Sequence, residues 1–236
     1  MAKRKEKRSW EVLRETTDQT TYDELDAMGV PAEAREAFFD SMTAHIMDGV
    51  VGLWYPPEEK SEGHTAEGLA VTIGQRLHNL ASLYNGAKTG SPIEDRMAGA
   101  LMWLELEWAG FPQADLVGGP RDHFELWGYR DKLDFFITPQ ARIGKYRADF
   151  LLWVSYGKHH GGVIVECDGH QFHEKNKEQA ARDKCRDREL LTAGYPVMRF
   201  TGSEIFKDPQ GCVEQVHAPL FDVLERVSKD GGLLSA

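Results

Sequence analysis

The first half of the chain carries apolar residues at helical spacing. Thr21 and Glu24 form a capping-box pattern, which predicts a short helix that Gly29 ends. Pro31 predicts the start of a second helix, whose apolar side includes Phe38. The pattern therefore predicts a helical N-terminal unit.

Two more helices are predicted further along. Residues 65–86 repeat apolar positions every three or four residues. The segment Ser91-Pro92-Ile93-Glu94 places serine at the N-cap, proline at the first helical position and glutamate at the third, which is typical of a helix start. We expect this helix to continue to about Trp108.

After residue 120 the pattern changes to short runs rich in β-branched and aromatic residues, which predict strands. A turn at 139–144 separates the first two strands, Gly194 ends a polar helix, and Ser203 marks another turn. The predicted strands are 133–138, 145–154, 162–168 and 196–201, and the predicted helices are 174–194 and 208–227. The order αβββαβα indicates an α/β fold.

Composition narrows the class of protein. The chain has 236 residues and 41% hydrophobic content, which is enough for one or two packed domains. The apolar stretches fall short of the roughly 18 residues of a membrane span, and no apolar segment follows the basic start. Three cysteines without a C-x-x-C pair build no disulfide framework. We expect a soluble, cytoplasmic protein with no membrane partner.

The net charge of −10 is unevenly distributed. Residues 9–110 hold 18 acidic and 6 basic residues, whereas residues 121–200 hold 12 acidic and 14 basic residues. A neutral-to-basic C-terminal half is compatible with a nucleic-acid partner despite the overall charge. The predicted division is a basic flexible tail (1–9), an acidic helical region (10–88) and an α/β domain (89–236).

Carboxylates gather where two of the predicted strands end. Because side chains alternate between the faces of a strand, Arg147, Asp149 and Leu151 are expected to share one face. Glu166 and Asp168 share one face of the following strand. Three converging acids in apolar surroundings need a cation. Hard oxygen ligands suit Mg²⁺ or Mn²⁺.

Three motifs carry a resemblance to a known superfamily. They are Tyr146-Arg147-Ala148-Asp149-Phe150, Val165-Glu166-Cys167-Asp168-Gly169-His170, and a later run from Arg182-Asp183 through Gly194-Tyr195-Pro196-Val197 to Arg199-Phe200. Together they resemble the restriction-endonuclease-like PD-(D/E)XK superfamily, and within it the very-short-patch-repair (Vsr-like) endonucleases. The resemblance covers roughly residues 91–227. It implies a mixed β-sheet flanked by helices, preceded here by the helical region.

The resemblance also implies a metal centre. Asp149 corresponds to the strand carboxylate, Glu166 to the second carboxylate and the backbone carbonyl of Cys167 to a further ligand, while Glu94 resembles the acid of the family's leading helix. Such a site holds one or two Mg²⁺ or Mn²⁺ ions, and the implied reaction is phosphodiester hydrolysis.

One position departs from the family pattern. The usual lysine two residues after the glutamate is replaced by Asp168. Relatives of the Vsr type use histidines in this region, so His170 and His173 are candidates for the general base. Lys145 and Gln140 are lower-ranked substitutes.

The implied substrate is DNA, with RNA as the other nucleic acid to consider. The acidic helical region is a candidate surface for a protein partner or for control of substrate access. The candidate nucleic-acid-binding residues are Lys145, Arg147, Lys175, Lys177, Arg182 and Arg186.

Each assignment has a structural alternative. Glu94 is explained by helix capping alone, and Asp149 can pair with Arg147 or Arg199. Asp168 before Gly169 is ordinary turn chemistry. The charges of helix 174–194 can also form a solvated face with i, i+4 pairs.

Two functional alternatives also remain. Cys167, His170 and His173 invite a zinc site, although alternation turns the cysteine side chain away from Glu166. Because the motif lysine is missing, the chain can also be a binding module without hydrolysis, recognising nucleic acid or a protein partner.

Overall fold

The computed structural model describes residues 23–47, 76–81, 83–84, 89, 91–104, 133–169 and 177–233, without the side chains of residues 43–47 and 177–180. The predictions for the tail 1–9 and for His170, His173 and Lys175 therefore lie outside the described residues, as does the side chain of Lys177. In the described part of the chain, no helix has the length and apolar character that crossing a membrane requires.

The N-terminal helices pack closely on one another. Gly29, with φ 77°, ends the first short helix as expected, and α2 then spans Ala32–Met47. α4 spans Pro92–Leu101, and its Gly99 lies so close to α2 that an added Cβ would be 2.1 Å from the Ala34 carbonyl oxygen. The glycine therefore allows the two backbones to approach.

α4 starts as predicted but ends earlier. The Ser91 hydroxyl accepts the amide of Glu94, and proline occupies the first turn. The helix ends at Leu101, not near Trp108, because the amide of Trp103 bonds to the Ala100 carbonyl three residues back, which tightens the last turn.

Four strands form one mixed sheet in the order β1-β2-β3-β4. β1 (Asp134–Ile143), β2 (Tyr146–Tyr156) and β3 (His159–Asp168) are antiparallel neighbours, and β4 (Val197–Thr201) pairs parallel to β3. The parallel pairing needs a crossover, and α6 (Lys177–Thr192) provides it. The predicted mixed sheet flanked by helices is confirmed.

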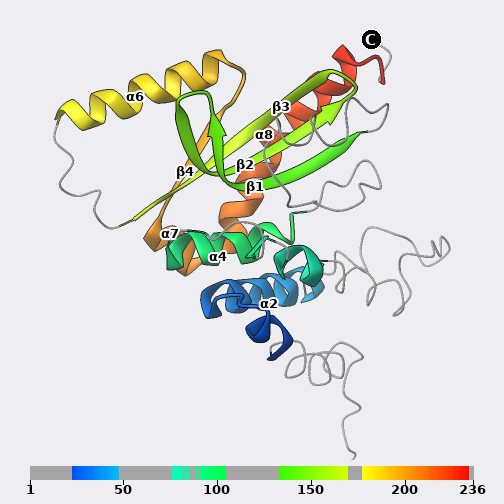
Figure 1. Cartoon of the computed structure of the whole chain (residues 1–236), viewed down its shortest axis with the longest axis vertical. Helices are drawn as coiled ribbons and strands as arrows, with labels where there is room; N and C mark the ends of the chain where they lie inside the picture. Colours follow the sequence, from blue (N-terminus) through cyan, green and yellow to red (C-terminus); the bar gives the residue numbers. More distant parts are fainter. Residues whose placement is uncertain are drawn as a thin grey trace, which may run out of the picture.

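Apolar side chains cover both faces of this sheet. Phe150, Leu152 and Val165 pack in a large core with side chains of α2, α4 and α8 (Pro209–Asp230). The opposite face carries a smaller cluster in which Leu190 of α6 packs against the sheet. Figure 1 shows α8 crossing behind the sheet, α2 and α4 at one end, and α6 beside the β1–β2 hairpin.

Two connections differ from the prediction. β1 continues through Pro139, which an edge strand tolerates, so the turn is confined to Gly144-Lys145, where Gly144 has φ 59°. Ser203 lies in the short helix α7 (Gly202–Lys207), since Thr201 and Glu204 form a complete capping box.

The helical region shares its core with the sheet. Phe38 of α2, Leu80 and Leu101 belong to the same cluster of buried side chains as Val163 and Val213. The division of the chain at residue 88 stays a prediction.

Candidate functional site

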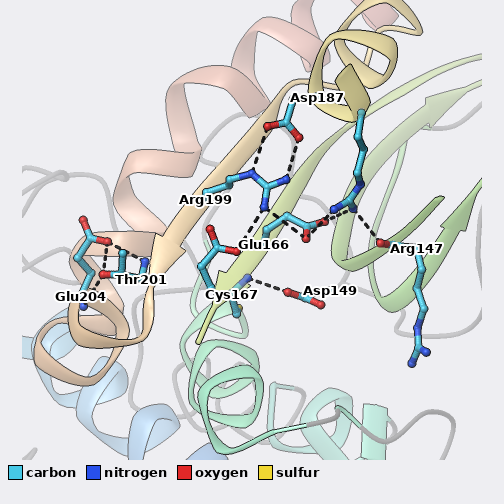
Figure 2. A network of polar contacts seen from close by, with 10 residues as sticks. Arg147, Asp149, Glu166, Cys167, Asp187, Arg199, Thr201 and Glu204 are labelled. Carbon is cyan, nitrogen blue, oxygen red and sulfur yellow. Dashed lines mark hydrogen bonds and ion pairs between the residues drawn. The ribbon is translucent and has the colours of Figure 1, made fainter. Parts of the chain in front are cut away.

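The two strands predicted to supply the metal ligands, β2 and β3, stop pairing just before Asp149 and Glu166. The β2–β3 ladder ends at the pair Phe150–Val165, and Asp149 and Glu166 are the next residues in register. Oδ2 of Asp149 accepts a hydrogen bond from the backbone N–H of Cys167 at 2.8 Å, as Figure 2 shows. A carboxylate therefore satisfies a backbone donor at the point where the strands part.

The strand pleat is interrupted at this point. Gln140 has φ 53°, and the β1–β2 register passes from Pro139–Phe150 to Ala141–Ala148. Ala148 packs in the same cluster as Leu151, whereas strict alternation would separate the two side chains. The prediction that Arg147 and Leu151 share one face is therefore wrong, because the alternation changes between Ala148 and Phe150.

Glu166 is held by Arg186 of α6. The two nitrogens of the Arg186 guanidinium donate to the two carboxylate oxygens at 2.5 and 3.2 Å. The Glu166 side chain is 8% exposed and that of Arg186 18%. Arg186 also donates to the backbone carbonyl of Arg147 at 2.8 Å. This bidentate pair neutralises the buried Glu166.

Arg199 of β4 is the centre of a second group of charges. It bonds to both oxygens of Asp187 at 2.8 and 3.2 Å and to Asp168 at 3.3 Å, and it lies 3.9 Å from Glu166. Burial alone would lower the pKa of Arg199, but these carboxylates, Asp187 first, raise it above its ordinary value. The arginine is therefore a permanent cation beside the two acids of β3.

The central carboxylates are difficult to ionise. Burial raises the pKa of Asp149, against the Cys167 N–H bond and the charges of Arg186 and Arg199. Burial also raises the pKa of Glu166, and the negative charge of Asp149 adds to this rise while Arg186 opposes it. The two acids therefore repel each other across the strand ends, and a cation between them would be stabilised.

Glu94 lies at the start of α4. Its backbone amide donates to Ser91 at 3.4 Å, and Gln140 of β1 donates a hydrogen bond to its carboxylate. Capping thus accounts for the amide and for one carboxylate oxygen, which accepts from the Ser91 hydroxyl at 3.3 Å, while the other oxygen contacts the residue at the interrupted pleat. Glu94 and Asp149 both contribute to the raised pKa of the Cys167 thiol, whose main cause is burial. Glu94 therefore lies close enough to influence the site electrostatically.

The arrangement supports a smaller metal site than the sequence predicted. Within the described ranges, no group of three or more His, Cys, Asp or Glu side chains is placed to hold a metal ion. Asp168 is bound to Arg199 and does not join Asp149 and Glu166 in such a group. Two carboxylates are still sufficient for Mg²⁺, which takes water and phosphate as its other ligands. Asp149 and Glu166 are therefore the described residues that could hold such a cation, and Arg186 occupies Glu166 in this structure.

The Cys167 side chain does not suit the zinc alternative. It packs against the large core, and burial raises the pKa of its thiol well above the ordinary value. Zinc binds the thiolate, which is disfavoured there. The other two ligands of that alternative, His170 and His173, lie outside the described residues.

The predicted nucleic-acid-binding residues fall into two groups. Arg186 is engaged with Glu166, and Lys145 pairs with Glu189 at 2.9 Å. The Glu189 hydrogen bond is the main reason why the pKa of Lys145 is raised, so this lysine is a poor base. Arg147 and Arg182 are exposed. Lys145 is exposed as well, so among the candidates whose side chains are described, Arg147 and Arg182 are exposed, Lys145 is exposed but paired with Glu189, and Arg186 is engaged with Glu166.

Sequence reasoning missed the position of Arg199 beside Glu166. The two residues are partners in the parallel β3–β4 register. The signal was the arginine in the last predicted strand, 196–201. Using this signal required knowing that the strand, β4 in the structure, pairs with β3.

The fold agrees with a comparison of the sequence with known families. The profile of the restriction-endonuclease-like family REase_MTES_1575 matches residues 130–220, which covers β1 to β4 and much of α8. This stretch of the chain resembles restriction-endonuclease-like domains, and its mixed sheet flanked by helices is the corresponding α/β fold. The match supports the superfamily and not the Vsr-like branch.

Other similarities are short. An uncharacterized protein of Haemophilus influenzae is 34% identical over 61 residues, which make up 26% of this chain and 49% of that protein. The chain thus spans about half the length of that relative. No solved structure is significantly similar to the chain.

Proposed function

We propose that the chain is a metal-dependent nuclease that hydrolyses phosphodiester bonds of DNA. The observation that carries the proposal is the Asp149–Glu166 pair, which occupies adjacent register positions where the β2–β3 ladder ends. Both side chains have a raised pKa, burial being the main cause. Perturbed acids at a strand edge are typical of functional sites.

Asp149, Glu166 and the carbonyl of Cys167 would hold Mg²⁺ or Mn²⁺, with Glu94 nearby. The cation would polarise the scissile phosphate and lower the pKa of an attacking water. The hydrogen bond from Cys167 N–H fixes one oxygen of Asp149 and so orients this carboxylate. This preorganisation places the negative charge without further movement of the strand.

Because the motif lysine is missing, charge stabilisation and proton acceptance must be provided by other residues. Arg199 supplies a fixed positive charge beside Asp168 and Glu166, where it can stabilise charge developing on a phosphate. A guanidinium does not act as a base at neutral pH. The proton acceptor is therefore sought in His170 or His173, because a neutral imidazole can accept a proton near pH 7.

The proposal also covers the substrate, a protein partner and the location in the cell. Arg142 and Arg147 are exposed partners across the β1–β2 hairpin, and they would contact phosphates of the DNA strand. RNA is the competing substrate. The acidic helical region would bind a protein partner, and the cytoplasm is the proposed location.

The test is cleavage by the purified full chain. Supercoiled plasmid, single-stranded DNA and RNA are incubated with Mg²⁺ or Mn²⁺, with EDTA as the metal-free control. We expect metal-dependent cleavage of DNA that Asp149→Asn lowers by roughly a hundredfold or more. Asp222→Asn, at an exposed position of α8, is the matched control and keeps full activity. No EDTA-sensitive cleavage of any substrate would refute the nuclease.

One observation favours a second candidate. Glu166 and Asp168 are already paired with Arg186 and Arg199, so the site is stable without a metal. A binding module without hydrolysis would keep these pairs. It would bind nucleic acid equally well in EDTA and in Mn²⁺, whereas the nuclease would bind more tightly in Mn²⁺.

A further inference from the structure

The two arginines beside Glu166 are held in different ways. Arg199 is fixed by Asp187, through two bonds, and by Asp168. Arg186 has one carboxylate partner among the described residues, which is Glu166. Releasing Arg199 would break its bonds to two other acids, whereas releasing Arg186 would separate one ion pair, with Glu166, and break its bond to the backbone carbonyl of Arg147. Arg186 is therefore the exchangeable one.

Arg186 occupies the oxygens that a metal would need. Its nitrogens lie 2.5 and 3.2 Å from the two carboxylate oxygens of Glu166. Its guanidinium carbon lies 5.7 Å from the centre of the Tyr146 ring, and its side chain is 18% exposed. A divalent cation at Glu166 would compete for these oxygens and would be repelled by the guanidinium.

A phosphate is a suitable second partner for Arg186. The guanidinium donates two parallel bonds to a carboxylate or to a phosphate with similar geometry. An incoming DNA strand would bring phosphates to the edge where Asp149 and Glu166 lie. A phosphate that takes Arg186 would thereby free both oxygens of Glu166.

We propose that Arg186 is an exchangeable counter-ion of Glu166 that passes to a substrate phosphate and so couples divalent-cation binding to phosphate binding. This inference rests on the proposed function, because it takes Asp149 and Glu166 as the cation ligands. In the proposed exchange Arg186 binds the substrate phosphate directly, and its departure frees Glu166 for the cation. The free protein then binds the cation weakly, and the nucleic-acid complex binds it more tightly.

Mn²⁺ binding to the full chain tests the exchange without measuring activity. Free Mn²⁺ is followed by electron paramagnetic resonance for the wild type, Arg186→Gln and Arg188→Gln, the last removing an exposed charge from the same helix. We expect Arg186→Gln to bind Mn²⁺ about tenfold more tightly, a typical coupling between sites, and Arg188→Gln to match the wild type.

The reciprocal measurement uses a phosphorothioate oligonucleotide labelled for anisotropy. Mn²⁺ should strengthen its binding to the wild type by about the same tenfold factor, and less so for Arg186→Gln. If Arg186→Gln does not fold, the wild-type measurement decides, since a lack of coupling overturns the exchange.

The outcomes separate the two proposals. Equal Mn²⁺ affinity in the wild type and Arg186→Gln, with binding lost in Asp149→Asn, overturns the exchange and leaves the nuclease. No Asp149-dependent Mn²⁺ binding in any variant overturns both.

Discussion

Glu166 and Arg199 are register partners in the parallel β3–β4 ladder, and the Arg199 guanidinium lies 3.9 Å from the Glu166 carboxylate. The same guanidinium bonds to Asp168 and Asp187, so one residue of β4 compensates acids from β3 and α6. The last strand thus contributes to the charge balance of the site as well as to the sheet.

Removing Arg199 should destabilise the protein strongly. Arg199→Gln removes the ion pairs that Arg199 makes with Asp168 and Asp187, and the arginine side chain is only 24% exposed. We expect a loss of about 2–4 kcal/mol in the free energy of unfolding, measured in urea. Lys229→Gln breaks the exposed i, i+4 pair with Glu225 and should cost about 0.5 kcal/mol or less. Similar losses in both variants would contradict the central position of Arg199.

Asp149 should reduce stability at neutral pH. Because burial raises its pKa above the ordinary value of 3.8, the native state binds its proton more tightly than the unfolded state does. Ionisation therefore costs stability as the pH rises above that value. Asp149→Asn, whose side-chain oxygen can still accept from Cys167 N–H, should be more stable by about 1 kcal/mol at pH 7 in EDTA.

The gain from Asp149→Asn should disappear towards pH 3, which thermal melting across pH would show. Glu204→Gln is the control of opposite sign. Bonds from Thr201 lower the pKa of Glu204, so its ionised form stabilises the native state above the ordinary pKa. This variant should be less stable at pH 7 and equal to the wild type at low pH. A constant gain for Asp149→Asn at all pH values would contradict the effect of burial.

Local features of this chain were predictable because they depend on neighbouring residues. Ser91 and Pro92 start α4, and Gly194, with φ 88°, follows the end of α6. Glu166 was recognised because an acid in an apolar strand is unusual. Its confirmed burial follows from the hydrophobic run that precedes it.

Non-local features were not predictable in the same way. The partners of Glu166 come from α6 and β4, and nothing in the local sequence brings Arg186 and Arg199 to it. Gln140 carries no local sign of a positive φ, since this conformation favours glycine, asparagine or aspartate. The interrupted pleat, and with it the surroundings of Asp149, therefore depends on tertiary structure.

Gln140 should tolerate glycine better than valine. At φ 53° a β-branched residue is strained, so Gln140→Val should cost about 1–3 kcal/mol in urea unfolding. Gln140→Gly loses the same hydrogen bond to Glu94 without the strain, and should remain within about 1 kcal/mol of the wild type. The reverse order would show that the hydrogen bond matters more than the backbone.

The contact between α2 and α4 should be sensitive to a single methyl group. In Gly99→Ala the new Cβ would lie 2.1 Å from the Ala34 carbonyl oxygen, so the helices must separate. We expect a loss of about 1–3 kcal/mol despite the better helix propensity of alanine. Gly169→Ala is the control, because among the described residues its new Cβ would meet Ile93 alone, at 3.7 Å. An unchanged melting temperature for Gly99→Ala would show that α2 is not part of the same cooperative unit.

Arg142 and Arg147 provide the test of phosphate binding by the hairpin. They are direct cross-strand partners in β1 and β2, both are exposed, and their positive charges repel each other. A polyanion would relieve this repulsion. Replacing both with glutamine should therefore weaken DNA binding and stabilise the hairpin by a few tenths of a kcal/mol.

The salt dependence of binding separates phosphate contacts from a loss of folding. Each phosphate contact contributes roughly 0.7–0.9 to the slope of log affinity against log salt concentration, so the double variant should lose about 1.5. Anisotropy of labelled DNA in EDTA measures this slope without cleavage. Lys158→Gln, at the exposed turn on the opposite end of β2, should leave it unchanged. Equal slopes for the double variant and the wild type would place the DNA on another face of the sheet.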